Sequence, residues 1–305
     1  MELVELLKEL GNTSQQVSAQ TLALFSGLDA RSTAALRDAW RRIPTARRRE
    51  IVQSFHTLAE DLVDMDFNQM FLFFLGDADV AVRVLAIDGL WEDERISTLH
   101  HLLERFDDPS SEVRAAVVAG LSHFAYRAEV GDLAPDAAHL VYQALLRVCL
   151  DQAEPLEVRR RAVEGIGYFR DLPEAQEEIG RAYAHPHHLM RESALVAMGR
   201  SMHPMWFATI ERELRNPSPA MRYEAARAAG ELSEEGCGLL PALIPLIEDE
   251  DLEVFQAVAW SLGQIGGAHA RRVLHRLTTS SNPSRAQAAR EALEELVALD
   301  LEEEG

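Results

Sequence analysis

Small and apolar side chains recur with helical spacing along most of the chain. After Arg114 they follow three, four and seven positions later, at Val117, Val118 and Leu121, which puts them on one face of a helix. The same stripe recurs after other arginines, and a second apolar stretch such as 206–214 precedes each copy. Each copy is therefore predicted to be a helical hairpin. No alternating run of apolar and polar residues supports a β-sheet.

An arginine at the start of each stripe defines a column whose successive members are 31, 45, 32, 31, 33 and 30 residues apart. A weaker copy of the stripe begins at Arg48. The single long interval predicts a loop insertion near 126–135, where Gly131 and Pro135 favour a turn. The members of this arginine column are Arg83, Arg114, Arg159, Arg191, Arg222, Phe255 (in place of arginine) and Arg285.

The turn at Asp108-Pro109, the following Val113-Arg114 and the small-residue stripe together resemble HEAT repeats, specifically the short HEAT-like class also found in phycobilin lyase subunits. The resemblance implies an all-α protein, a right-handed α-solenoid of about seven stacked hairpins whose stacking buries the apolar faces. It also implies that the column arginines pair with acidic or carbonyl groups of the adjacent turn. Asp77 and Asp108 precede Arg83 and Arg114 by six residues, which suits that role.

The predicted domain organisation has three parts. Residues 1–65 match the repeat poorly and are predicted to form an N-terminal helical cap with a degenerate first repeat, with helices at 2–10, 29–42 and 44–63. An alternative for this part is a docking element for a partner. Residues 66–300 are predicted to form the solenoid, and 301–305 an acidic tail.

Composition narrows the classes of protein. Of 305 residues, 47% are apolar and 26% charged, as in folded proteins, and the net charge of −20 disfavours nucleic acid as a partner. No apolar run is long enough to span a membrane, and the first residues do not read as a secretory signal. Two cysteines, Cys149 and Cys237, cannot build a disulfide framework or a four-thiolate zinc site. A cytoplasmic location is the expectation.

Motifs for catalysis or metal binding are missing from the sequence. It contains no His-Glu dipeptide, no Gly-x-Ser-x-Gly and no phosphate-binding glycine loop. His185, His187 and His188 cluster around a proline, where turns favour polar residues. We therefore predict no metal, no cofactor and no catalytic residue, although residues scattered in the sequence could still meet in the folded chain.

By the same resemblance, positions five and nine after the arginine column should point to the concave surface of the solenoid. The first inner-face column reads Asp88, Ala119, Glu164, Val196, Arg227, Trp260 and Arg290. The second inner-face column reads Glu92, His123, Tyr168, Arg200, Glu231, Gln264 and Glu294. Both are acidic early and carry arginine and aromatic residues later, which are favoured at binding hot spots. The partner-binding candidates are Tyr168, Arg200, Arg227, Trp260 and Arg290, with simple packing as the alternative for Trp260.

A second candidate is a basic patch in an otherwise acidic chain. Residues 31–50 carry a net charge of +5 and residues 51–110 a net charge of −10. The patch could bind phosphate groups, form the solvated face of an amphipathic helix, or pair with the acidic segment that follows. The juxtaposition also permits head-to-tail self-association. The residues of this basic patch are Arg41, Arg42, Arg47, Arg48 and Arg49.

Three functions follow from this architecture without catalytic motifs. The leading hypothesis is a non-enzymatic scaffold or adaptor that binds a protein partner on its concave face. The alternative is a lyase-like or modification accessory protein, based on the resemblance alone. The third is a DNA-binding repeat protein, which the net charge opposes.

Overall fold

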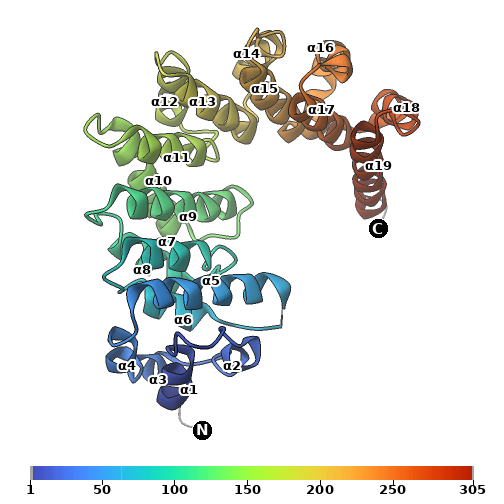
Figure 1. The fold of residues 1–305 in the computed structure, drawn as a ribbon. Helices are drawn as coiled ribbons and strands as arrows, with labels where there is room; N and C mark the ends of the chain where they lie inside the picture. The colour runs from blue at the N-terminus through green and yellow to red at the C-terminus, as the bar shows by residue number, and fades with distance from the viewer. Residues whose placement is uncertain (1–2, 63, 304–305) are drawn as a thin grey trace. The chain divides into compact units, whose positions relative to one another are not determined.

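The computed structural model describes residues 3–62 and 64–303, and its regular elements there are all helices (Figure 1). The predicted all-α fold is confirmed. The α-helices are α1 (Leu3–Leu10), α2 (Ala19–Ala23), α3 (Ala30–Ala34), α4 (Arg37–Arg41), α5 (Thr45–Asp61), α6 (Asn68–Phe74), α7 (Val80–Asp88), α8 (Ile96–Glu104), α9 (Ser111–Glu129), α10 (Pro135–Leu150), α11 (Leu156–Ile166), α12 (Pro173–Tyr183), α13 (His188–Ser201), α14 (Phe207–Glu213), α15 (Pro219–Glu231), α16 (Leu240–Leu243), α17 (Leu252–Ile265), α18 (Gly267–Leu277) and α19 (Pro283–Glu303). Short 3-10 helices are η1 (Pro204–Trp206), η2 (Ser233–Leu239) and η3 (Ile244–Glu248).

The arginine column marks the same place in every hairpin. Each member is the third or fourth residue of an odd-numbered helix, from Arg83 in α7 to Arg285 in α19. The even-numbered helix before it, from α6 to α18, is the other arm of the hairpin. Arg48 takes the same place in α5, so α5 is the corresponding helix of the weaker copy. We call the odd-numbered helices from α5 to α19 the inner helices. The predicted series of stacked hairpins is confirmed.

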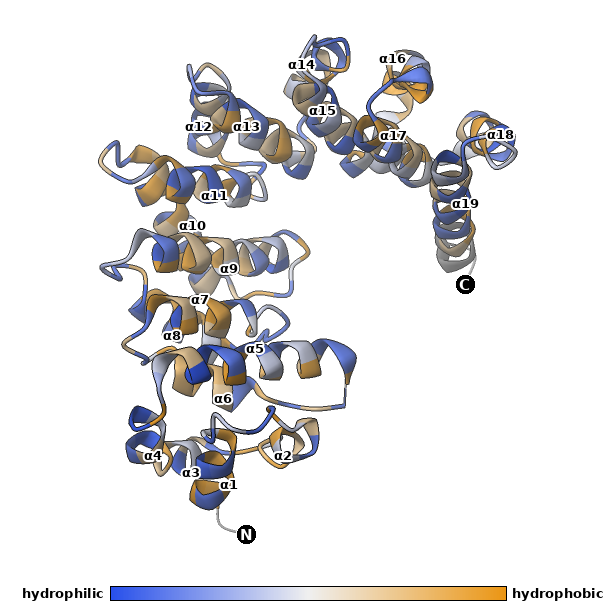
Figure 2. Ribbon diagram, in the orientation of Figure 1, coloured by the Kyte–Doolittle hydropathy of each residue, from blue (hydrophilic) through white to orange (hydrophobic). Residues whose placement is uncertain are grey.

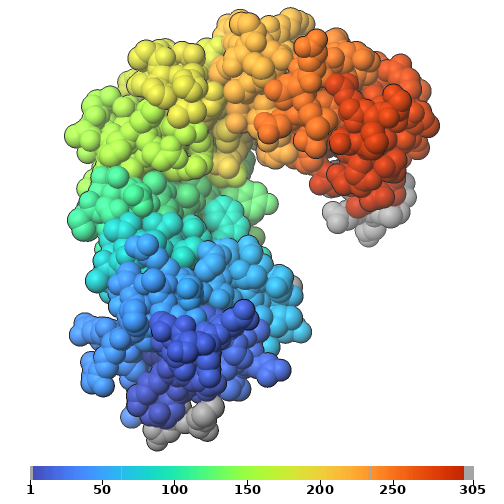
Figure 3. Space-filling view, in the orientation of Figure 1, coloured from blue at the N-terminus to red at the C-terminus, as the bar shows by residue number. Residues whose placement is uncertain are grey.

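The chain divides into two units. The first comprises residues up to 127 together with 131–141, and the second comprises 128–130 together with the residues from 142 onward. This boundary falls inside the predicted repeat domain of residues 66–300. Within each unit, the side chains of successive hairpins meet without gaps in the space-filling view (Figure 3).

The first unit has an aromatic core that joins the N-terminal helices to the hairpins. Phe55 of α5 is fully buried, and its ring centroid lies 5.9 Å from Phe25, 5.1 Å from Phe67 and 5.7 Å from Phe74. Residues before position 65 therefore share a core with α6. The helix predicted for 29–42 is two short helices, α3 and α4, with a break between them.

In the second unit the inner helices α11, α13, α15, α17 and α19 pack successively on one another. Glycine permits their close approach eight residues after the arginine column. A Cβ on Gly199 would lie 2.8 Å from Cα of Ala228, and one on Gly263 would lie 2.8 Å from the carbonyl oxygen of Ala292. Blue and orange residues share the same helices in Figure 2, as amphipathic helices require.

Two predicted boundaries need correction. The loop predicted near 126–135 is shorter than expected, because residues 126–129 belong to α9 and only residues 130–134 lie between α9 and α10. The extra residues of the long interval lengthen the flanking helices, α9 to 19 residues and α10 to 16. The predicted acidic tail begins as helix, since residues 301–303 belong to α19, and residues 304 and 305 lie outside the described residues.

Candidate functional site

Two of the column arginines, Arg83 and Arg222, link consecutive turns. The Nη1 of Arg83 donates to the carbonyl oxygen of Asp77 at 3.0 Å, in the turn before its own helix. Its Nε and Nη2 donate to the carboxylate of Asp108 at 3.0 and 2.8 Å, in the turn of the next hairpin. Arg222 repeats the second contact, because its Nε and Nη2 donate to Asp249 at 2.7 and 2.9 Å. Both guanidinium groups are therefore engaged within the protein, as the resemblance implies for the column arginines.

The contacts differ at the hairpin where phenylalanine replaces the column arginine. The guanidinium carbon of Arg285 lies 4.7 Å from the ring centroid of Phe255. Arg285 donates to the carbonyl oxygen of Ile247 at 2.8 Å and to that of Asp249. The turn before α17 is thus contacted by a guanidinium from the next inner helix, α19.

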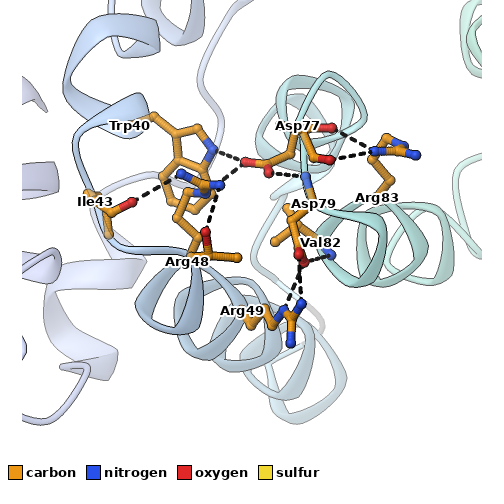
Figure 4. Close-up of polar contacts among 10 residues, drawn as sticks. Trp40, Ile43, Arg48, Arg49, Asp77, Asp79, Val82 and Arg83 are labelled. Atoms are coloured by element: carbon orange, nitrogen blue, oxygen red, sulfur yellow. Dashed lines mark hydrogen bonds and ion pairs between the residues drawn. The ribbon is translucent and has the colours of Figure 1, made fainter.

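Two members of the basic patch pair with the acidic segment that follows it (Figure 4). The Nε of Arg48 lies 3.1 Å from a carboxylate oxygen of Asp77, which also accepts a 2.6 Å hydrogen bond from the indole of Trp40. Arg49 donates twice to Asp79, at 2.8 and 2.6 Å. These arginines join α5 to the turn before α7.

The rest of the basic patch is divided between core and surface. Arg47 is buried and donates to the carbonyl oxygen of Leu10 at 2.7 Å, which anchors α1 to α5. Arg41 and Arg42 are exposed. Arg41 lines a cavity of about 700 Å³ together with Arg37 and Arg105. The five arginines therefore do not form one continuous free surface.

Four of the five partner-binding candidates meet as stacked pairs in the second unit, three of them on inner helices and Tyr168 in the turn after α11. The guanidinium of Arg227 lies 3.5 Å from the ring centroid of Trp260, and that of Arg200 lies 5.0 Å from Tyr168. Each pair joins successive members of one inner-face column, so the column spacing brings them together. Arg290 is exposed and donates to Gln287 of its own helix.

Trp260 also lines a groove between α17 and α19 with a volume of about 530 Å³. We call this the Trp260 groove; its walls are Gln256, Trp260, Ala288, Glu291, Ala292, Glu294 and Glu295. The groove thus combines a large aromatic ring with three carboxylates. Such a surface suits the apolar and hydrogen-bond-donating side chains of a protein.

Folding brings together three carboxylates that lie about 30 residues apart in the sequence, Glu164, Glu192 and Glu224. Burial and the neighbouring carboxylates Glu164 and Glu192 raise the pKa of Glu224 to about 7. Glu164 is itself buried and accepts a 2.6 Å hydrogen bond from the hydroxyl of Ser193. Arg227 lies close enough to Glu224 to oppose this shift. The inner surface around Arg227 therefore changes charge near neutral pH.

The histidine cluster has a local role in its turn. Nδ1 of His185 accepts a 3.1 Å hydrogen bond from the backbone amide of His187, whose ring stacks on His188. Among the described residues, no three histidine, cysteine or carboxylate side chains are grouped as metal ligands. Within the same part of the chain, no helix is both long and apolar enough to cross a bilayer.

Comparison with known families bears on the repeat itself. Residues 208–294, which include most of α14 and run into α19, match the family model of HEAT repeats. The chain folds as an α-solenoid, and its residues 208–294 are HEAT repeats. No curated protein matches this chain significantly.

Two solved structures share its fold. One is the complex of CpcE and CpcF of phycocyanin lyase from Nostoc sp. PCC7120, at 17% identity and a TM-score of 0.53, covering 74% of this chain and 86% of the other. The second is yeast importin-beta (Kap95p), at 12% identity and a TM-score of 0.54, covering 97% of this chain. This chain spans 46% of the importin's length. Identities this low show a common fold alone.

Proposed function

We propose that this HEAT-repeat protein is a non-enzymatic scaffold that binds a protein partner on the inner-helix surface of its second unit. The observation that carries the proposal is the stack of Arg227 on Trp260 at the edge of the Trp260 groove. Tryptophan and arginine are the residue types that contribute most to binding energy at interfaces. A partly exposed pair of this kind gives a partner a large, amphipathic contact.

The stacking itself supports a binding role. Arg227 is held over the indole and also lies 3.7 Å from a carboxylate oxygen of Glu231 on the same helix. Both side chains are therefore ordered before a partner arrives, which lowers the entropy that binding must remove. Tyr168 and Arg200 repeat the arrangement, and Arg200 is further fixed by a 2.9 Å hydrogen bond to the carbonyl oxygen of Glu164.

A lyase-like accessory role is the second candidate, supported by the fold shared with the phycocyanin lyase subunits. Bilin chromophores carry two propionate groups, and the three glutamates of the Trp260 groove would repel them. A tetrapyrrole titration followed by absorbance tests this candidate, since a saturable spectral change would support it. The same carboxylates oppose a DNA-binding role, which a salt-sensitive mobility shift would support.

Site-specific photocrosslinking tests the scaffold. A photoreactive phenylalanine derivative replaces Gln256 in the Trp260 groove or, as a control, exposed Arg272 on α18. In lysate of the native organism, the groove position should give a discrete protein adduct that the α18 position does not give. Trp260→Ala should abolish the adduct, whereas Met205→Ala, which removes an exposed apolar side chain elsewhere in the unit, should retain it.

The outcomes separate the alternatives. An adduct that survives Trp260→Ala would move the binding surface away from the groove. A lack of any protein adduct at the groove position would contradict the proposed scaffold function there. Circular dichroism of each variant establishes that a lost adduct reflects binding and not unfolding.

A further inference from the structure

The first unit contains a cavity of about 580 Å³ at the end of α7, between α5, the start of α6 and the turn that follows α7. We call it the acidic cavity. Its aromatic walls are Phe67, Phe71 and Trp91, and its carboxylates are Glu60, Asp64, Asp66, Asp88 and Glu92. His56 and Asn68 complete the polar lining. The lining residues that the structure describes include no lysine or arginine, and Arg95 interacts electrostatically with Asp66 from outside the lining.

The cavity exists because α7 is short. α5 has 17 residues and α7 only 9, so their lengths are about 25 Å and 13 Å. α7 ends at Asp88, and at the next residue the ring of Phe71 comes so close that a Cβ on Gly89 would lie 2.4 Å from it. The C-terminal half of α5 is left beside an opening, where a longer inner helix would have packed.

Trp91 stands at an exceptional place in the repeat. It lies eight residues after Arg83, a position that in four of the six later hairpins is a glycine touching the next inner helix and in the other two is Ser122 or Leu293. The later glycines are Gly167, Gly199, Gly230 and Gly263. Here the largest side chain replaces the smallest, and it is 55% exposed. A tryptophan at this repeat position cannot serve the usual helix contact, so its indole is available at the rim.

Trp91 is nevertheless positioned. Its ring centroid lies 5.4 Å from the ring of His123, which belongs to α9 in the same unit. Burial lowers the pKa of His123, so the imidazole is neutral at physiological pH and does not repel a cation near Trp91. An ordered, exposed indole beside carboxylates is the arrangement that attracts a cation to an aromatic face.

The charge of the lining selects the ligand. Asp88 and Glu92 are the first members of the two inner-face columns, and three further carboxylates face the same space. Among the described lining residues the basic group is His56, whose Nδ1 lies 3.5 Å from Glu60. Arginine fits this lining better than lysine, because its planar guanidinium stacks on an indole while donating in pairs to carboxylates.

We propose that the acidic cavity binds an arginine-bearing segment of a protein partner, with one guanidinium stacked on Trp91 and paired with Asp88 or Glu92. Further basic side chains of the segment face Glu60 and Asp64 at the other side of the opening. Five carboxylates exceed the charge of one guanidinium, so a segment with several arginines matches the cavity better than a single small cation. This inference rests on the proposed scaffold function, because it takes the ligand to be part of a protein partner.

Fluorescence anisotropy with a labelled di-arginine peptide tests the proposal on the full chain at physiological ionic strength. Its counterpart with citrulline in place of both arginines keeps the shape and removes the charge. The wild type should bind the arginine peptide at least about tenfold more tightly than the citrulline peptide. Trp91→Ala and Glu92→Gln should each weaken binding of the arginine peptide by about tenfold.

A matched control separates the cavity from the overall negative charge. Glu112→Gln and Asp136→Asn remove exposed carboxylates of α9 and α10 that do not line the cavity, and should change affinity less than about twofold. Equal losses in control and cavity variants, or equal binding of both peptides, would overturn the proposal. So would a wild type that ignores the peptide but self-associates in sedimentation through Trp91, because the occupant would then be a second copy.

These outcomes do not depend on the Trp260 groove. Peptide binding that needs Trp91, combined with no adduct at position 256, would leave the acidic cavity as the binding site and remove the groove. An adduct at position 256 combined with no peptide binding at Trp91 would keep the proposed function and overturn this inference.

Discussion

The guanidinium of Arg222 and the carboxylate of Asp249 share two parallel hydrogen bonds, of 2.7 and 2.9 Å, across 27 residues of chain. The side chains are 17% and 7% exposed, so solvent screens the pair only weakly. The hydrogen bonds from Arg222 lower the pKa of Asp249 below its usual range. Since Asp249 lies in the turn of the next hairpin, this pair fastens one hairpin to another.

Asp249→Asn is therefore expected to lower the free energy of unfolding by about 2 kcal/mol at neutral pH, because it leaves the buried guanidinium without its charged partner. The exposed neighbour provides the control: Glu250→Gln should change stability by less than about 0.5 kcal/mol. Urea unfolding monitored by circular dichroism measures both. A folded carboxylate with a lowered pKa stabilises above its unfolded pKa, so the gap between wild type and variant should close as pH falls below the ordinary value of 3.8.

Glu224 should make stability fall as pH rises. Its pKa is raised from 4.5 to about 7 in the folded protein, so between these values the unfolded carboxyl ionises while the folded one keeps its proton. Glu224→Gln should match the wild type near the ordinary pKa and exceed its free energy of unfolding by about 3 kcal/mol near pH 8. Glu231→Gln, an exposed change on the same helix, should not flatten the profile. Parallel profiles for wild type and Glu224→Gln would contradict the raised pKa.

Gly199→Ala is expected to destabilise the second unit by about 1–3 kcal/mol, because the new methyl would meet the backbone of Ala228 at 2.8 Å and push α13 from α15. Gly238→Ala is the matched control, since its Cβ would meet no atom within 4 Å. It should leave stability unchanged or raise it by up to about 1 kcal/mol. Thermal unfolding of the two variants distinguishes a steric clash between α13 and α15 from the general effect of replacing glycine by alanine. Similar melting temperatures would argue against the close approach of the two helices.

Ala194 is fully buried between inner helices, so Ala194→Asp should destabilise by several kcal/mol through burial of a carboxylate. Ala220→Asp places the same side chain in the exposed first turn of α15, where a negative charge is tolerated. Differential scanning calorimetry should show a much lower melting temperature for the first variant alone. Equal melting temperatures would mean that the helical stripe does not face the core.

The sequence was sufficient for the repeat because the chemistry recurs at fixed spacing. The column arginines place the start of each inner helix within one residue, and the two inner-face columns put Arg227 beside Trp260 and Tyr168 beside Arg200. The long interval after Arg114 was misjudged, because its turn residues are also compatible with two lengthened helices around a short turn.

The acidic cavity depends on features that one sequence does not display. Nothing in the periodicity ends α7 at Asp88, because the following residues could continue a helix; the contact of Phe71 with Gly89 is what brings Trp91 to the rim. The departure of Trp91 from the glycine position was a visible signal. The raised pKa of Glu224 arises from its burial and from the carboxylates of Glu164 and Glu192 in two other hairpins, so it follows only from the packing of the hairpins.

Phe255 interrupts the arginine column, and its neighbour Arg285 supplies the guanidinium from the next helix. The two hairpins that contain Phe255 and Arg285 therefore depend on each other for this contact. If a hairpin from earlier in the array were transplanted in place of the one bearing Phe255, its own arginine would confront Arg285 over the same carbonyl oxygens. Such repeats share a shape without being interchangeable, and the order of these two hairpins is fixed by the side chains that each presents to the other.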